Sequence, residues 1–446
     1  MSAVAASQRP AGHVKTSADP LWSVYRVELE KLFHQLAIRV LVLVCALGPF
    51  AFAAVLRIQS GTPTDAVFGV WVHSTGVAIS LVILSFAGSW GFPLVAGVVA
   101  GDMFSSEDRN NTWKMILVRS CTRGEVFTGK VLAAVTLTSA LLVATMASSI
   151  AAGAVFVGAH ALVGSTGQLI ASGHALALTV IASLVCLVPL LAYTSLAVLF
   201  SIATRNGIMG VVGPLIVALA TTLLGLIGNG VWMHLLLIGS TFTTYFALFT
   251  AHPYFGPLLV SLAANLLWAI GALAAGWTIL RRRDFVARAT SRGSTWVAPL
   301  CVLVVTTATI AVLALLGNAG PVGVTAPRLD AAVAATFNKL TLLQQQIIGR
   351  QVPAGAGLDI VPYCSRRGQR SVGPGDWTCN VDVFLPQPKR VPFQRSIVEY
   401  DVSVSADGCF KAQSPPAFVG GPTMTDAAGR QVVNPLFIVY GCFNIL

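Results

Sequence analysis

The chain has 446 residues, of which 55% are hydrophobic and 10% charged, and its mean hydropathy is +0.77. Typical soluble domains carry roughly 25% charged residues, so the composition excludes an ordinary soluble protein and indicates a membrane protein. The formal net charge of +11 does not call for nucleic acid as a partner, because most of the basic excess follows the membrane topology derived below.

Residues 1–35 are expected to form a cytosolic N-terminus that ends in an amphipathic helix. Asp19 and Pro20 suit the cap and the first turn of this helix. Apolar residues then recur at helical spacing: Trp22, Tyr25, Leu29, Leu32 and Leu36. A helix with such a stripe next to a membrane should lie along the inner surface. The alternative is a polar helix that continues directly into the first span.

Seven stretches are apolar enough to cross a membrane, which takes about 20 residues. They lie near Leu36–Leu56, Gly76–Ala100, Val131–Val157, Ala175–Phe200, Ile208–Gly228, Pro257–Leu280 and Trp296–Leu316. Six of them fall within a core at residues 36–285, and residues 286–317 would supply a cytosolic linker and the seventh span. No charged residue lies in the middle of a stretch, which argues against a proton-driven transporter.

One of these stretches is rich in glycine. Gly207, Gly210 and Gly213 would let the fifth span approach a neighbouring helix closely, unless they only reflect the Gly-rich composition of the chain.

The basic residues predict the orientation, because they favour the cytoplasmic side. Of the 17 Lys and Arg in residues 1–317, only Arg57 falls on the outer side. The amino terminus is therefore expected to be cytoplasmic and the carboxyl-terminal tail extracytoplasmic, in a multi-pass protein of the plasma (inner) membrane. Residues 229–256 could pass as an eighth span, but that would place the basic cluster at residues 281–292 outside. They are predicted to form an outer re-entrant or interfacial segment.

The polar loop at residues 101–130 is the most informative segment. It holds five basic and four acidic residues in a membrane portion that is otherwise almost uncharged. Gly124 to Lys130 fits the phosphate-loop pattern G-x-x-x-x-G-K, but Val131 stands where Ser or Thr should hold magnesium, and no strand precedes it. The seven His are scattered without metal-binding spacing. We therefore expect neither ATP hydrolysis nor a metal site in this chain.

The run NTWKMILVRSCTR at residues 111–123, followed by Gly129 and Lys130, resembles the coupling loop of type-2 ATP-binding-cassette (ABC) exporter permeases. The surface helix, the six spans, the outer re-entrant segment and the RRRDF sequence at residues 281–285 are similar too. The resemblance covers about residues 20–285 and implies an α-helical polytopic core of six spans. The chain departs from the family at Asn111, where Gly often stands, in lacking a Pro near Ser120, and in its seventh span and long tail.

In that family the loop forms a coupling helix that docks in a groove of a separate ATPase subunit. The resemblance assigns this role to ten residues: Glu107, Asp108, Arg109, Thr112, Trp113, Lys114, Ile116, Leu117, Arg119 and Arg123. Trp113, Ile116 and Leu117 would form an exposed apolar knob, consistent with the enrichment of aromatic residues in interfaces.

Four charged residues would contact the rim of the groove: Glu107, Asp108, Arg109 and Lys114. Arg119 and Arg123 would pair with acidic residues of the ATPase or with anionic lipid heads. The alternative is a solvated loop whose charges only fix the topology.

Residues 318–446 are predicted to form an extracytoplasmic α+β domain. Helical spacing predicts a helix from Arg328 to Gly349, and alternating segments around VPYCSRRG, WTCNVDVFL, VEYDVSVSADGCF and PLFIVYGCF predict short strands. Four of the eight Cys lie here, which suggests two disulfides in an outer domain. Three pairings exist, of which Cys364–Cys379 with Cys409–Cys442 is our preferred one. A metal site is the weaker alternative, because close C-x-x-C spacing is absent.

Together these features suggest a bacterial permease subunit that moves an amphipathic or lipid-like substrate outward and is not itself an enzyme. It would bind no cofactor, and ATP and magnesium would be used by the partner ATPase. The expected partners are that ATPase, a second permease chain (a copy or a paralogue), the lipid bilayer and an envelope protein at the outer domain. The alternative is a non-transporting mechanotransmission or sensory protein that regulates an envelope partner. A membrane enzyme would need clustered polar residues at the membrane surface, which we do not find.

Overall fold

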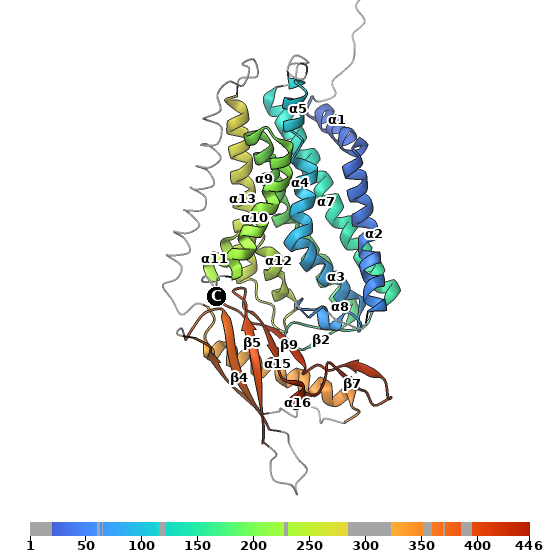
Figure 1. Cartoon of the computed structure of the whole chain (residues 1–446), viewed down its shortest axis with the longest axis vertical. Helices are drawn as coiled ribbons and strands as arrows, with labels where there is room; N and C mark the ends of the chain where they lie inside the picture. Colours follow the sequence, from blue (N-terminus) through green and yellow to red (C-terminus); the bar gives the residue numbers. More distant parts are fainter. Residues whose placement is uncertain are drawn as a thin grey trace, which may run out of the picture.

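The computed structural model describes ten parts of the chain: residues 20–59, 63–64, 66–113, 115, 122–226, 231–283, 323–350, 359–368, 371–384 and 395–446. In Figure 1 these residues form a bundle of long helices with a β-sheet at one end. Helices α1 and α5 lie at the end opposite the sheet. The predicted seventh span, Trp296–Leu316, lies outside the described residues.

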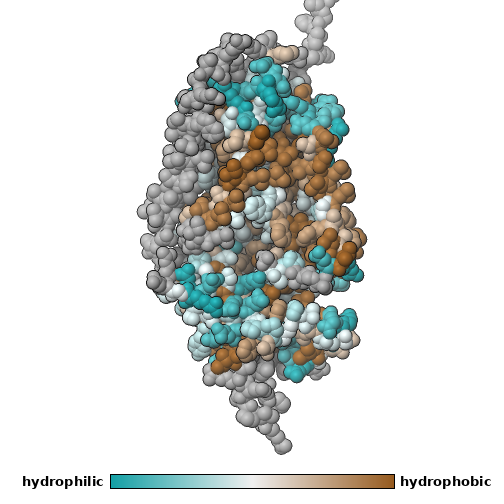
Figure 2. Space-filling model, in the orientation of Figure 1, coloured by the Kyte–Doolittle hydropathy of each residue, from teal (hydrophilic) through white to brown (hydrophobic). Residues whose placement is uncertain are grey.

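Six helical segments in the described residues are long and apolar enough to cross a membrane. They are α2 (Leu36–Ile58), α3 with η2, α4 and α5 (Gly76–Arg109), α7 (Arg123–Phe156), α8 with α9 (Ser172–Thr204), α10 (Gly207–Leu226) and α13 (Gly256–Arg281). Each coincides with one of the six predicted core spans. In Figure 2 hydrophobic side chains cover the middle of the bundle, and hydrophilic ones gather toward its ends. The chain is therefore a polytopic membrane protein.

Two of these segments are interrupted. In the second, α3 (Gly76–Phe86) is followed by the π-helical turn η2 (Ala87–Gly91), α4 (Phe92–Ala100) and α5 (Ser105–Arg109). In the fourth, α8 (Ser172–Val185) and α9 (Leu187–Thr204) meet at Cys186. Pro93 and Pro189 lie just after these interruptions, where the missing N–H of proline does least damage to the helical hydrogen bonds.

The amphipathic N-terminal helix is α1 (Pro20–His34). It packs along α7, with Glu28 and Leu32 buried and Trp22 exposed. The backbone at Gln35 is extended (φ −75°, ψ 130°), so α1 ends there and α2 starts in a new direction. The alternative prediction, a polar helix that continues directly into the first span, is therefore wrong.

Glycines allow several helices to cross with their backbones in contact. A Cβ atom on Gly210 of α10 would lie 2.0 Å from the carbonyl oxygen of Gly101, which follows α4. On α7, a Cβ atom on Gly153 would lie 2.3 Å from the carbonyl oxygen of Gly76 at the start of α3. No real Cβ fits at such distances, so α10 contacts α4 and α7 contacts α3 only because these positions are glycine.

The described part of the outer segment is built from pieces too short to span a bilayer: α11 (Val231–Leu236), α12 (Thr241–Thr244) and the 3₁₀ helix η3 (Tyr245–Phe249). Buried Asn265 of α13 anchors them. Its Oδ1 accepts a hydrogen bond from the Gly239 amide at 2.9 Å, and its Nδ2 donates to Thr241 Oγ1 at 3.1 Å. The described residues of this segment, 231–256, thus form no eighth span.

The described residues from 323 to 446, here called the sheet unit, combine one long helix with an antiparallel sheet. The sheet has the strand order β3–β4–β5–β6–β9, and it is accompanied by a small β7–β8 hairpin. The elements are α15 (Ala326–Ile347), β3 (Asp359–Arg366), β4 (Gly375–Phe384), β5 (Arg395–Val404), β6 (Cys409–Gln413), α16 (Pro416–Val419), β7 (Thr423–Thr425), β8 (Gln431–Val433) and β9 (Ile438–Cys442).

Helix α15 covers the sheet with the apolar stripe read from the sequence. Phe337 meets Tyr400 of β5 edge to face, with 4.6 Å between ring centroids, and Leu329 and Val333 are fully buried. The helix lies within two residues of the predicted Arg328–Gly349, and all four predicted strand segments lie in the sheet. The β7–β8 hairpin was not predicted, because each strand has only three residues and these are exposed or half-buried.

The sheet unit is attached to the helical bundle through β9. The amide of Cys442 donates to the carbonyl of Ser165 at 3.0 Å, and the Ser165 amide donates to the carbonyl of Phe249 in η3 at 2.9 Å. The Tyr440 hydroxyl donates to the carbonyl of Thr64. Ser165 lies in the turn between the short strands β1 (Leu162–Val163) and β2 (Leu169–Ile170). The connection between α7 and α8 is thus hydrogen-bonded directly to the sheet unit.

Both bonds of the preferred disulfide pairing are formed. Cys364 of β3 bonds to Cys379 of β4, and Cys409 of β6 bonds to Cys442 of β9. In each case the two residues are direct cross-strand partners. Each bond therefore joins neighbouring strands of the sheet.

We expect replacement of Gly210 by Leu to destabilise the protein by about 3 kcal/mol, since the new side chain meets backbone that cannot move aside. Gly271→Leu in α13 is the control, because a Cβ atom there has nothing within 4 Å. Thermal unfolding of the purified chain in detergent measures both. Equal midpoints for the two variants would contradict the close crossing of α10 and α4.

Non-reducing peptide mapping should recover the two disulfides in separate fragments. Replacing Cys364 and Cys379 together by Ser should lower the stability of the sheet unit by about 3 kcal/mol, because the unfolded chain gains freedom. Four free thiols in the mapping experiment would refute both bonds.

Candidate functional site

The candidate site is an ionic cluster where α1, α5 and α7 meet, at the end of the bundle opposite the sheet unit. Its centre is Lys130, the eighth residue of α7, whose side chain is fully buried. The Lys130 Nζ donates to Glu28 Oε1 of α1 at 2.7 Å and to Glu107 Oε1 of α5 at 3.1 Å. A third bond goes to the carbonyl of Met103 at 3.1 Å. All three hydrogens of the ammonium group are thus used.

The local sequence explains why α7 extends as far as Lys130. Thr122 caps the helix: its hydroxyl accepts from the Glu125 amide, and the Glu125 carboxylate accepts from the Thr122 amide. This reciprocal capping box starts α7 at Arg123, eight residues before the predicted span. Residues 124–130 are therefore helical, and the amine of Lys130 is bound by carboxylates. This arrangement is incompatible with a phosphate-binding loop.

A second lysine extends the cluster toward solvent. Lys31 Nζ, on α1, lies 2.6 Å from Glu107 Oε1, and the hydroxyl of Thr112 donates to the other oxygen of Glu107. Partial burial tends to lower the pKa of Lys31, but the carboxylates of Glu28 and Glu107 outweigh it and raise that pKa. Two lysines thus face two glutamates, so the buried charges are balanced.

A second group of contacts joins the loop to the end of α13. The indole Nε1 of Trp113 donates to Asp108 Oδ1 at 2.9 Å, and the same carboxylate oxygen pairs with Arg283. Arg123, the first residue of α7, donates to the carbonyls of Arg281 at 2.8 Å and of Arg283 at 3.1 Å. The two groups of contacts together tie the loop to α1, α7 and α13.

The structure corrects the predicted role of two loop residues. Trp113 was expected in an exposed knob, but it is 5% exposed and stacks on Phe104, with 6.3 Å between ring centroids. Glu107 was expected at the rim of an ATPase groove, but it is also buried, at 5% exposure. Both side chains face the bundle because their polar atoms have hydrogen-bond partners there. The sequence of the loop alone does not reveal these partners.

The remaining predicted coupling residues are distributed unevenly. Arg109 is exposed and pairs with Asp102 at 2.9 Å, so it stays available at the surface. Asp108 and Thr112 lie inside the contacts described above, and Arg123 caps α13 instead of facing outward. Lys114, Ile116, Leu117 and Arg119 lie outside the described residues. Met115, beside them, is 65% exposed and is the apolar residue that the loop presents to solvent in its described part.

The sequence did not lead us to Glu28 or Asp102, and Lys31, Lys130 and Arg283 were used only as topology signals or motif residues. One signal was available: Lys130 opens an otherwise apolar span, where a charge requires a partner. Nothing in the sequence indicates that the partner lies 102 residues earlier, on α1.

The described residues contain no group of three or more His, Cys, Asp and Glu that could hold a metal ion. The side chains of the Lys130 cluster are amines, carboxylates and a hydroxyl. Such a set can hold helices in fixed relative positions, and it contains no activated nucleophile.

Residues 25–213 match the family model described as ABC-2 family transporter protein. The matched part runs from α1 into α10 and contains the Lys130 cluster entirely. The match confirms the resemblance seen in the sequence. The comparison with curated proteins found no match.

We expect Lys130→Met to destabilise the chain by about 3–5 kcal/mol, because two buried carboxylates lose their partner. Arg109→Ala is the matched control: it removes an exposed ion pair, which is worth at most about 1 kcal/mol. Thermal unfolding in detergent compares the two. A Lys130 variant as stable as the Arg109 variant would show that the buried cluster does not hold α1 on the bundle.

Proposed function

Since residues 25–213 match the model described as ABC-2 family transporter protein, we propose that this chain is a type-2 ABC permease, the membrane-spanning subunit of an ATP-driven exporter. The observation that carries this proposal is the Lys130 cluster. It joins the short loop between the second and third spans to α1 and α7, while the Asp108–Arg283 pair joins the same loop to α13. A push on this loop would therefore move three helices together.

The push would come from a separate ATPase subunit that uses ATP and magnesium. Its docking surface would be the tip of the loop, where Asn110, Asn111 and Met115 are exposed and where Lys114, Ile116, Leu117 and Arg119 follow in the sequence. Arg109 would contribute a rim contact. The buried Trp113 would stabilise the conformation of the loop beneath this surface, because its indole N–H donates a hydrogen bond to Asp108.

The orientation follows from the distribution of charge along the chain. The distribution of basic residues supports a cytoplasmic loop and amino terminus, in a cell that we propose is bacterial. The sheet unit lies at the opposite end of the bundle, as an extracytoplasmic α+β domain would (Figure 1). The seventh span at Trp296–Leu316 would bring the chain across the membrane to it. Two disulfides suit an oxidising compartment outside the plasma membrane.

A working exporter would pair this chain with a second permease chain, either a copy or a paralogue, and with two ATPase subunits. ATP-driven closure of the ATPases would open a path between the two membrane halves for an amphipathic or lipid-like substrate. The sheet unit would then cap the exit or bind an envelope protein.

One observation favours the alternative of a non-transporting mechanical protein. Because β9 is hydrogen-bonded to the α7–α8 connection, movement of α7 would also move the sheet unit and whatever it binds. Outward flux that disappears when the loop is altered supports export. Unchanged flux with loss of an envelope partner's activity supports the mechanical role.

A tagged chain, purified from its native membranes in mild detergent, should bring an ATPase with it in stoichiometric amount. Met115→Asp should reduce the recovery about tenfold, because it places a charge in the proposed apolar contact. Phe418→Asp is the control: this side chain is equally exposed, at 62%, but lies in the sheet unit. Absence of an ATPase from all three samples would overturn the proposed function.

A further inference from the structure

A cavity of about 450 Å³ lies where α9, α10, the outer segment and the sheet unit meet. Its walls come from Tyr193 of α9, Thr221 and Thr222 of α10, His234 of α11 and the turn that carries Asp407 between β5 and β6. It thus occupies the junction between the membrane spans and the sheet unit, where a substrate leaving the bundle would pass if the proposed function is correct.

The charge of the lining is unusual for this chain. Among the residues that line the cavity, Asp376 and Asp407 are acidic and none is Lys or Arg, although the chain as a whole carries +11. The neighbouring Arg366 is not a lining residue; its guanidinium donates to the carbonyls of Val372 at 2.8 Å and of Pro374, which lines the cavity, at 2.6 Å. The cavity is therefore an acidic place in a basic protein.

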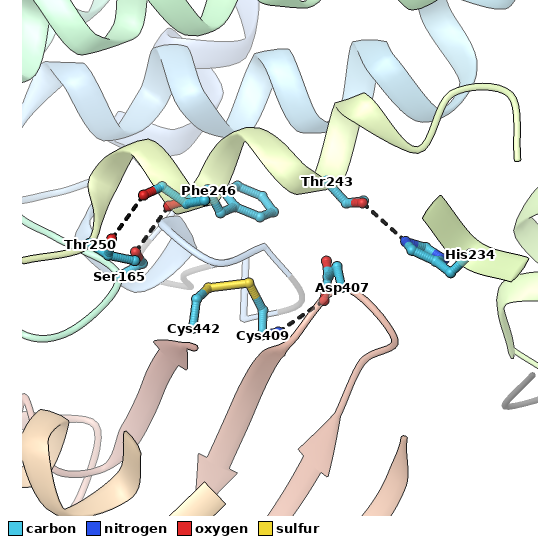
Figure 3. The surroundings of a disulfide bond; sticks show 9 residues. Ser165, His234, Thr243, Phe246, Thr250, Asp407, Cys409 and Cys442 are labelled. Atoms are coloured by element: carbon cyan, nitrogen blue, oxygen red, sulfur yellow. Dashed lines mark hydrogen bonds between the residues drawn. A yellow bond between two sulfur atoms is a disulfide. The ribbon is translucent and has the colours of Figure 1, made fainter. Parts of the chain in front are cut away.

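Two polar groups of this cavity have no Lys or Arg partner among its lining residues. Asp407 is only 7% exposed; its carboxylate accepts from the Cys409 amide at 3.0 Å, and the Thr243 hydroxyl and His234 also lie against it. Burial raises the pKa of Asp407, an effect that nearby His234 only partly offsets. His234 Nε2 lies 3.3 Å from Thr243 Oγ1, while its buried Nδ1 has no hydrogen-bond partner among the described residues. Figure 3 shows Asp407 below the outer segment, near Thr243 and His234.

The rest of the lining combines the hydroxyl groups of Ser and Thr with apolar and aromatic side chains. Leu237, Ile238 and Phe242 come from the outer segment, and Phe242 packs on Phe92 with 5.8 Å between ring centroids. Aromatic rings attract organic cations through their faces, and a buried carboxylate without a Lys or Arg partner gains most from a cationic ligand. The described residues of this wall form no group of three or more His, Cys, Asp and Glu that could hold a bare metal ion.

We propose that this cavity binds amphipathic organic cations, with Asp407 as the counter-ion and Tyr193, Phe242 and the neighbouring aliphatic side chains as the apolar wall. This inference narrows the substrate class of the proposed exporter. It rests on the proposed function only for the placement of the site on an export path. Binding itself requires no ATPase.

The test uses tetraphenylphosphonium, a rigid organic cation, and tetraphenylborate, an anion of the same shape. Equilibrium dialysis is done with the full-length chain in lipid nanodiscs, and empty nanodiscs correct for uptake by the lipid. We expect saturable binding of the cation alone. Asp407→Asn, which keeps the acceptor for the Cys409 amide, should weaken that binding at least about tenfold, equivalent to 1.4 kcal/mol.

Two further variants distinguish a loss of binding from misfolding of the Asp407 variant. Ser403→Lys adds a positive charge at an exposed lining position and should also weaken cation binding. Asp426→Asn is the control, because this carboxylate caps the β7–β8 turn and does not line the cavity. Equal affinity of wild type, Asp407→Asn and Ser403→Lys for the cation, or equal binding of the anion, would overturn the site. The exporter proposal would still stand or fall on recovery of the ATPase.

Discussion

The arrangement of the end of the bundle opposite the sheet unit depends on one buried ammonium group. Lys130 has no exposed surface, so its charge is tolerated only while the carboxylates of Glu28 and Glu107 remain in contact with it. These partners lie on different helices. Any displacement of α5 relative to α1 or α7 would separate buried charges, and the low-energy movement is one in which the three helices shift together. A short loop can therefore act on a large part of the bundle.

Helix α7 connects this cluster with the opposite end of the molecule. Its 34 residues correspond to a length of about 50 Å. Near one end lies Lys130; near the other, Gly153 packs directly against Gly76, and the following connection accepts the hydrogen bond from β9 through Ser165. A rotation imposed at the ionic cluster would thus reach the sheet unit through a single continuous helix, without a chain of flexible side chains between them.

The six core spans, the amphipathic helix and the sheet could be predicted because each depends on a local pattern: apolar length, helical spacing or strand alternation. The preferred cysteine pairing was also correct, since β3–β4 and β6–β9 are neighbours in the sheet. The loop was harder. Hydropathy cannot tell whether Trp113 faces a partner protein or its own helices, and the decisive contact with Asp108 depends on tertiary structure. The same limit applies to Glu28 and Lys130, which are distant in sequence.

The sequence led us to expect an amphipathic or lipid-like substrate, and the middles of the spans carry no charge. The structure qualifies this inference, because Asp407 and His234 face a cavity just where the spans end and the sheet unit begins. An amphipathic molecule has two parts with different requirements. Its apolar part can follow the lipid-like surfaces of the helices, whereas its charged part needs a counter-charge only where it leaves the bilayer. For the proposed amphipathic cation, spans without charge and a carboxylate where they meet the sheet unit would be two consequences of the same physical demand.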